Sequence, residues 1–274
     1  EIAFTSSNVP IANWLKPLNP NQPNQSKKVP RVTNGILEAA KGCIDFFSPF
    51  FPNLPSRAPR TITPANAAAL AGVIVLGARE GRFGKKGEKK SMQPFAASSI
   101  PLVTLGTFLL WFGWFGFNGF SQLAMGTFDD VNAISKIAVN THLAGAAGTF
   151  TGAAITRLIG GKTDIVMMLN GALAGLVAIT AEPLTPGPIT AMFIGSIGAI
   201  IMYFGTKMLE SYGLDDVVGA IPVHMFAGIF GTLVVPLTNS ETSFGTQFIG
   251  TASVCIFSFG LSWITFTLLK STIG

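Results

Sequence analysis

Two histidines, His142 and His224, are the only ones in this chain of 274 residues. His224 lies near the middle of the apolar stretch DDVVGAIPVHMFAGIFGTLVVPL. An ionisable side chain is costly inside an apolar helix, so a histidine at this position marks a polar pathway or a proton relay. A neutral histidine hydrogen-bonded to a neighbouring helix is the alternative. His142, in AVNTHLAGAAG, lies nearer a helix end, which favours a packing role.

The segments that must position these side chains are long and apolar. Residues 101–123, PLVTLGTFLLWFGWFGFNGFSQL, carry no formal charge and can cross a bilayer core of about 30 Å as a helix. Further spanning helices are predicted at about 131–158, 164–182, 187–210, 216–237 and 243–270. A seventh apolar stretch, 65–78, follows Pro64 and is short, which predicts a truncated helix. The expected fold class is therefore an all-α, polytopic membrane protein, with residues 61–274 as its transmembrane domain.

Composition agrees with a membrane protein. Charged residues make up 11% of the chain, Gly reaches 31 residues, and the mean hydropathy is +0.51. The net charge of +5 does not indicate a nucleic-acid partner, because the basic residues lie in loops and near the N-terminus rather than beside aromatic platforms. No nucleophile and base pair, metal-ligand cluster or phosphate loop is recognisable, so neither an enzyme nor a cofactor is expected. Cys43 and Cys255 are too far apart in sequence to indicate a disulfide framework.

The orientation follows from the basic loops. The loop 79–90, REGRFGKKGEKK, carries six basic residues against two acidic ones, which predicts a cytoplasmic position. Alternation of the helices then puts the C-terminus and the other basic helix ends on the same side, including Arg157, Lys162, Lys207 and Lys270. The loops around Asp129 and Pro186 are expected outside.

Residues 1–60 differ from the rest, because they hold nine of the seventeen prolines together with many Asn, Ser and Gln residues. Such a composition is typical of a disordered or non-native segment that builds no core. Residues 35–51, GILEAAKGCIDFFSPFF, could form an interfacial amphipathic helix. The alternative is that this segment has no native structure.

Four ordered motifs carry a resemblance: LGTFLLWFGWFGFN, AVNTHLAGAAG, LNGALAGLVAIT, and DDVVGAIPVH followed by GIFGTL. They lie at helix-sized separations within residues 66–270, and the chain resembles the ammonium transporter family (Amt, Mep and Rh proteins). The resemblance implies a fold of eleven membrane helices, ten of them in two inverted repeats of five around a narrow pore, assembled as a homotrimer. This chain is expected to hold the second repeat and the last helix.

The resemblance also implies roles for single residues. His224 resembles the second of two pore histidines, Trp114 a pore-lining tryptophan beside them, and Phe117 one of two stacked phenylalanines at the outer mouth. Ser121 stands at the serine of an outer recruitment site, where aromatic faces and a hydroxyl hold a cation. Leu110 matches a pore-lining apolar residue.

Two further matched residues are expected to be structural. Asn118 would stabilise helix contacts through its amide. Asp216 matches an aspartate at a helix start, where it and Asp215 could cap the helix. The glycines at 145, 148, 152, 171 and 175 are expected to let helices approach closely.

The sequence departs from the family at its N-terminal side. The first pore histidine should fall at position 62, which is Ile62, and the first repeat has no counterpart in residues 1–60. A truncated or joined sequence is therefore expected rather than a working half-transporter. One inverted repeat alone would expose polar and small-residue helix faces to lipid.

The expected function is transport of ammonium or ammonia, with methylammonium as an analogue, through a narrow hydrophobic pore in the cell membrane. The chain would act as a fragment of a complete transporter. The alternatives are a non-transporting ammonium sensor, a co-assembling membrane subunit, and an inactive truncated product. The bacterial family members imply PII-type signalling proteins as partners, although the short segment after the last predicted helix does not favour this.

Overall fold

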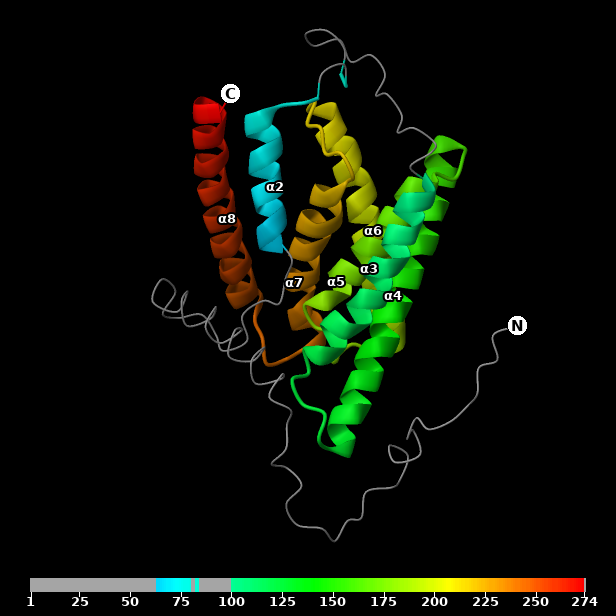
Figure 1. Ribbon diagram of the computed structural model, residues 1–274. Helices are drawn as coiled ribbons and strands as arrows, with labels where there is room; N and C mark the ends of the chain where they lie inside the picture. The colour runs from blue at the N-terminus through cyan, green and yellow to red at the C-terminus, as the bar shows by residue number, and fades with distance from the viewer. Residues whose placement is uncertain (1–62, 80–81, 84–99, 274) are drawn as a thin grey trace, which may run out of the picture. The chain divides into compact units, whose positions relative to one another are not determined.

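The computed structural model describes residues 63–79, 82–83 and 100–273, all of them within the unit Asn53–Gly274. Figure 1 shows that these residues form helices. In chain order they are α2 (Thr63–Leu76), α3 (Ile100–Phe120), α4 (Phe128–Gly160), α5 (Ile165–Thr180), α6 (Pro188–Ser211), η3 (Ile221–Phe226), α7 (Ala227–Thr238) and α8 (Phe244–Ile273). The all-α prediction is confirmed for this part of the chain. The predicted segment 1–60, with its helix at 35–51, lies outside the described residues.

Each predicted spanning stretch coincides with a helix to within a few residues. Among the described residues, four segments are long and apolar enough to cross a membrane: Ile100–Phe120, Pro188–Ser211, Ile221–Thr238 and Phe244–Ile273. The helix α4 is longer but less apolar, and α5 has 16 residues, or about 24 Å. The helix predicted at about 164–182 is present, and it ends two residues earlier, at Thr180.

The helix α4 has defined signals at both ends. Thr127 and Asp130 form a capping box, in which the Thr127 hydroxyl accepts from the Asp130 N–H at 3.1 Å. Gly161 ends the helix in the left-handed conformation, with φ of 71°. The Gly161 cap ends α4 just before the turn to α5, and α5 packs back along α4.

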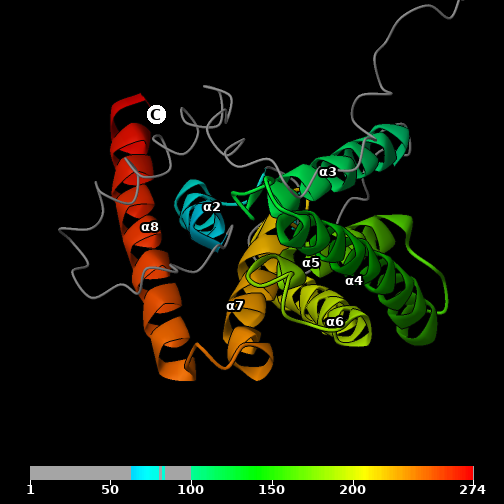
Figure 2. The same cartoon turned by 90° about the horizontal axis from the view of Figure 1, so that it is seen from below.

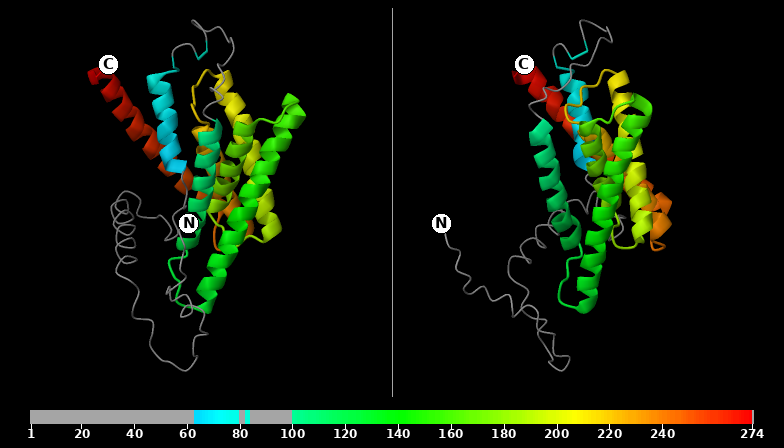
Figure 3. Two further views of the ribbon diagram at one scale, coloured as in Figure 1. Left: turned by 45° about the vertical axis from the view of Figure 1, so that its right-hand side comes forward. Right: turned by 90° about the vertical axis from the view of Figure 1, so that its right-hand side faces the viewer.

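Helices α4, α5 and α6 form the most closely packed group. A Cβ atom added to Gly171 would lie 2.6 Å from the Gly148 carbonyl oxygen, and one added to Gly152 would lie 2.8 Å from the Met167 carbonyl oxygen. The backbones of α4 and α5 are therefore in direct contact, which confirms the prediction from the glycine spacing. Figure 3 shows α4 running beside α3 and α6.

Helix α8 packs along α2, and α2 also contacts η3 (Figure 2). The Lys270 ammonium donates to the Val75 carbonyl at 2.6 Å, so the C-terminal ends of α8 and α2 lie together. Large apolar side chains on the helices face outward, among them Phe112, Phe150 and Ile256. These apolar helices form a multi-pass membrane protein.

The helix predicted to begin at 216 begins instead at Ile221. Its first part is a π-helix, and Gly219 before it has a φ of +76°, which the absence of a side chain makes accessible. A Cβ at Gly219 would also lie 2.6 Å from the Asn170 amide nitrogen. Irregular backbone at 214–219 thus replaces the first predicted helical turn.

Candidate functional site: an aromatic and histidine cluster between α3, α5 and η3

Leu110, Trp114 and Phe117 lie on one face of α3, because spacings of three and four residues stack side chains along a helix. Trp114 is buried, with 6% of its surface exposed, whereas the side chains of Leu110 and Phe117 are about half exposed. Along this face of α3, the buried Trp114 therefore lies between two half-exposed side chains.

His224 lies in the π-helical segment η3. Short π-helical segments are rare and occur often at functional sites, because they displace side chains from the regular helical positions. The imidazole ring of His224 is nearly parallel to the indole of Trp114, with centroids 6.2 Å apart and planes 12° apart. Its Nδ1 atom is buried and has no hydrogen-bond partner among the described residues.

Trp114 makes two further contacts. Its ring meets Phe117 edge to face, with centroids 6.1 Å apart. Its indole N–H donates to the Thr180 hydroxyl at 2.7 Å. The structure thus brings together His224, Trp114 and Phe117. Thr180 was not a predicted site residue, although it ends the motif LNGALAGLVAIT.

Ser121 and Asn118 lie at the end of the same helix. The Ser121 hydroxyl donates to the Phe117 carbonyl at 2.8 Å. The Asn118 amide donates to the Thr141 hydroxyl on α4 at 2.9 Å, and both residues are buried. Asn118 therefore links α3 to α4, while Ser121 stays close to Phe117.

His142 is not part of this cluster. Its ring lies on α4 against Trp111 and Phe115, at centroid distances of 5.5 and 6.0 Å. The exposed ring thus packs on the aromatic side chains of α3.

The two aspartates before η3 have different partners. The Asp216 carboxylate accepts from the N–H groups of Ala220 at 3.0 Å and Ile221 at 2.8 Å, so it satisfies donors at the helix start. Burial raises the pKa of Asp216 above its usual value, and the backbone N–H groups oppose that shift.

The expectation that Asp215 caps this helix is wrong. Its carboxylate binds Arg79 at 2.7 Å and Arg82 at 3.2 Å, because the segment after α2 lies beside it. The hydrogen bond from the Arg79 side chain lowers the pKa of Asp215, and burial opposes this. Asp215 thus joins the end of α2 to the turn before η3.

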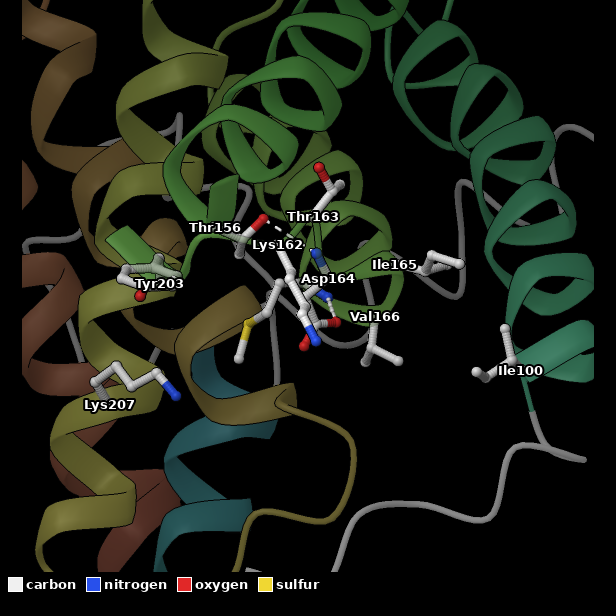
Figure 4. Close-up of a pocket in the computed structure, with 11 residues that line it drawn as sticks. Ile100, Thr156, Lys162, Thr163, Asp164, Ile165, Val166, Tyr203 and Lys207 are labelled. Atoms are coloured by element: carbon white, nitrogen blue, oxygen red, sulfur yellow. Dashed lines mark hydrogen bonds between the residues drawn. The ribbon is translucent and has the colours of Figure 1, made fainter. Parts of the chain in front are cut away.

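A separate cavity of about 480 Å³ lies near the start of α5. Figure 4 shows the residues that line it. Its lining includes Thr163, Asp164, Tyr203 and Lys207, and it contains none of the predicted site residues. Within the described residues, no group of three His, Cys, Asp or Glu side chains could hold a metal ion.

Comparisons with known proteins identify a family and several similar proteins. Residues 64–274 match the family described as "Ammonium Transporter Family". The chain is 38% identical over 226 residues to "Ammonium transporter Amt2" of Archaeoglobus fulgidus, covering 75% of this chain and 47% of that protein.

Solved structures are also similar. A structure titled "Sensor Amt Protein" matches with a TM-score of 0.70 and 31% identity, covering 77% of this chain and 53% of that one. Mep2 from Candida albicans matches with a TM-score of 0.66 and 26% identity, covering 77% and 49%. The chain spans about half the length of these relatives. The expectation of a membrane transport protein rather than an enzyme agrees with this family, and the chain belongs to the ammonium transporter family.

Proposed function

We propose that this chain forms part of a pathway for ammonium or ammonia across a membrane, with His224 and Trp114 at its centre. The observation that supports it most is the nearly parallel packing of the His224 and Trp114 rings between membrane helices. Family membership supports the same substrate. Leu110, Phe117 and Ser121 complete the proposed path along α3.

The proposed mechanism rests on desolvation. A hydrated ammonium ion that enters an apolar channel must be matched by aromatic faces and acceptors, or must give up its proton. The half-exposed ring of Phe117 and the hydroxyl of Ser121 offer the first kind of contact. Deprotonation of ammonium gives neutral ammonia, which crosses an apolar pore with few polar contacts. Potassium and sodium ions have no proton to lose and therefore cannot cross in this way.

His224 is the proposed proton carrier of this path. Its buried Nδ1 lacks a partner among the described residues, and a buried polar atom without a partner is energetically costly. A second ring or the substrate itself would satisfy it. The position expected to hold a first histidine, Ile62, lies outside the described residues.

Asn118 and Asp216 have structural roles in this proposal. The Asn118 hydrogen bond to Thr141 fixes the spacing of α3 and α4. Asp216 closes the start of η3. Both therefore act through the position of Trp114 or His224 rather than through substrate contact.

Assembly and orientation follow from the family and from charge. We propose a homotrimer in the cell membrane, with the loop 79–90 and the C-terminus in the cytoplasm. Lys270 contacts Val75, and Arg79 contacts Asp215, so these helix ends lie together. This arrangement supports a single basic side. Cytosolic PII-type proteins would approach from that side.

A sensing role is the second candidate, because a similar structure is titled "Sensor Amt Protein". A sensor would bind ammonium without supporting growth on it. The two functions are separated by expressing the full-length protein in cells that lack their own ammonium transporters. Growth on low ammonium with uptake of labelled methylammonium is expected, and binding without uptake would favour the sensor.

A further inference from the structure

Thr180, the last residue of α5, accepts a hydrogen bond from the indole N–H of Trp114 at 2.7 Å. We propose that Thr180 is a positioning residue, which fixes the plane of the Trp114 indole beside His224 and thereby sets the shape of the proposed path. This inference rests on the proposed function. It concerns a residue whose hydroxyl is hydrogen-bonded to Trp114 and to the Leu176 carbonyl.

The direction of the hydrogen bonds at Thr180 is determined by its single hydroxyl proton. The Thr180 hydroxyl donates to the Leu176 carbonyl at 2.6 Å, so its lone pairs remain to accept from the Trp114 indole N–H at 2.7 Å. The two bonds form a short chain from Trp114 through Thr180 to the backbone of α5. Each bond in such a chain polarises the next and strengthens it.

Helix α5 provides a rigid support for this acceptor. Every residue from Leu169 to Thr180 is buried. Gly171 on α5 packs directly against the backbone of α4. The packing of α5 fixes the backbone of Thr180, and the hydrogen bond to the Leu176 carbonyl fixes the rotamer of its hydroxyl. The acceptor for the Trp114 indole N–H is thus held in one position.

Three contacts together define the orientation of the indole. Its N–H is held by Thr180, one face lies along His224, and Phe117 meets the ring edge to face. Of these, only the hydrogen bond is directional enough to select one rotation of the ring. Without it, a buried N–H would lack a partner, and the indole would gain by turning toward another acceptor.

The test compares two substitutions at Thr180 in the full-length protein. Thr180→Val keeps the shape of the side chain but removes the hydroxyl, and Thr180→Ser keeps the hydroxyl. Thr232→Val is the matched control, because Thr232 is fully buried and its hydroxyl donates to the Gly228 carbonyl at 2.9 Å. This control removes a similar backbone-directed hydroxyl from α7.

The first readout is the indole N–H vibration of Trp114, measured by ultraviolet resonance Raman spectroscopy and isolated by subtracting the spectrum of Trp114→Phe. We expect a strongly hydrogen-bonded N–H in the unsubstituted protein and in Thr180→Ser, and a weakly bonded one in Thr180→Val. A weakly bonded Trp114 N–H in the unsubstituted protein would overturn the inference, even if Thr180→Val does not fold.

The second readout is flux into proteoliposomes. Thr180→Val is expected to lower ammonium flux about tenfold and to change the ratio of ammonium to methylammonium flux, with Thr180→Ser restoring both and Thr232→Val changing neither. Unchanged flux and ratio in Thr180→Val would overturn the inference while the proposed function stands. Absence of flux in the unsubstituted protein would instead reject the proposed function, and the Raman spectrum would still report the hydrogen bond.

Discussion

The indole of Trp114 lies almost parallel to the imidazole of His224, although the two residues come from different helices. Helix α5 contacts both α3 and η3, so it acts as the common support for the two rings. The face of a tryptophan attracts cations, and a neutral imidazole accepts a proton. In the proposed path, the indole face would attract the desolvated ammonium ion and the imidazole would accept its proton.

Substitution of Gly171 tests the close contact of α4 and α5. Gly171→Ala would place a Cβ about 2.6 Å from the Gly148 carbonyl oxygen, and backbone on both sides cannot yield easily. We expect a loss of about 1–3 kcal/mol in the free energy of unfolding, seen as a lower thermal midpoint in detergent. Gly160→Ala is the control, because a Cβ there meets nothing within 4 Å. Equal midpoints for the two variants would show that the helices are not this close.

Removal of the Asp216 carboxylate tests the start of η3. Asp216→Ala leaves the N–H groups of Ala220 and Ile221 without their acceptor, at a cost of about 0.5–2 kcal/mol in the free energy of unfolding. His224 lies in η3, three residues after Ile221. A disturbed start of η3 should therefore displace His224 and lower ammonium flux. Asp129→Ala, at an exposed position in the first turn of α4, is the comparison and should change flux little. Normal flux and stability in Asp216→Ala would contradict the structural role.

The ion pairs of Asp215 predict a particular dependence on pH. The folded-state pKa of Asp215 lies below the usual value of 3.8, so its contribution to stability is present above that value and is lost as pH falls through the lower folded-state pKa. Asp215→Ala should cost about 1.5–3 kcal/mol at neutral pH. The gap between variant and unsubstituted protein should shrink below about pH 3.8.

The exposed pair of Lys207 and Glu210, at 3.1 Å, provides the control for this experiment. Glu210→Ala should cost at most about 1 kcal/mol, because solvent screens an exposed pair. A stability gap for Asp215→Ala that stayed constant down to the lowest pH would mean that the ion pairs with Arg79 and Arg82 do not stabilise the fold.

Much of the fold could be predicted because apolar length and glycine spacing are local properties of the sequence. The approximate limits of α3, α6 and α8 followed from long apolar stretches, and the spacing of small residues indicated that some helices approach closely, as α4 and α5 do at Gly148 and Gly171. The family motifs pointed to Trp114 and His224 as neighbours. That expectation depended on resemblance rather than on spacing.

Other features could not be predicted because they depend on residues far apart in sequence. Asp215 was expected to cap a helix, but Arg79, 136 positions away, takes its carboxylate. The π-helical turn at Ile221–Phe226 reflects a choice of backbone hydrogen bonds that no residue pattern signals. Thr180 resembles any helix-end threonine until the fold places the Trp114 indole beside it.

The most direct test measures ion flux through the full-length protein in proteoliposomes for the unsubstituted chain and for His224→Ala. Gradients of ammonium, methylammonium and potassium are applied in separate experiments under otherwise equal conditions. The account predicts ammonium and methylammonium flux without potassium flux in the unsubstituted protein, and loss of that flux or of its selectivity in His224→Ala. Unchanged flux with unchanged selectivity in His224→Ala would contradict a path that passes along His224 and Trp114.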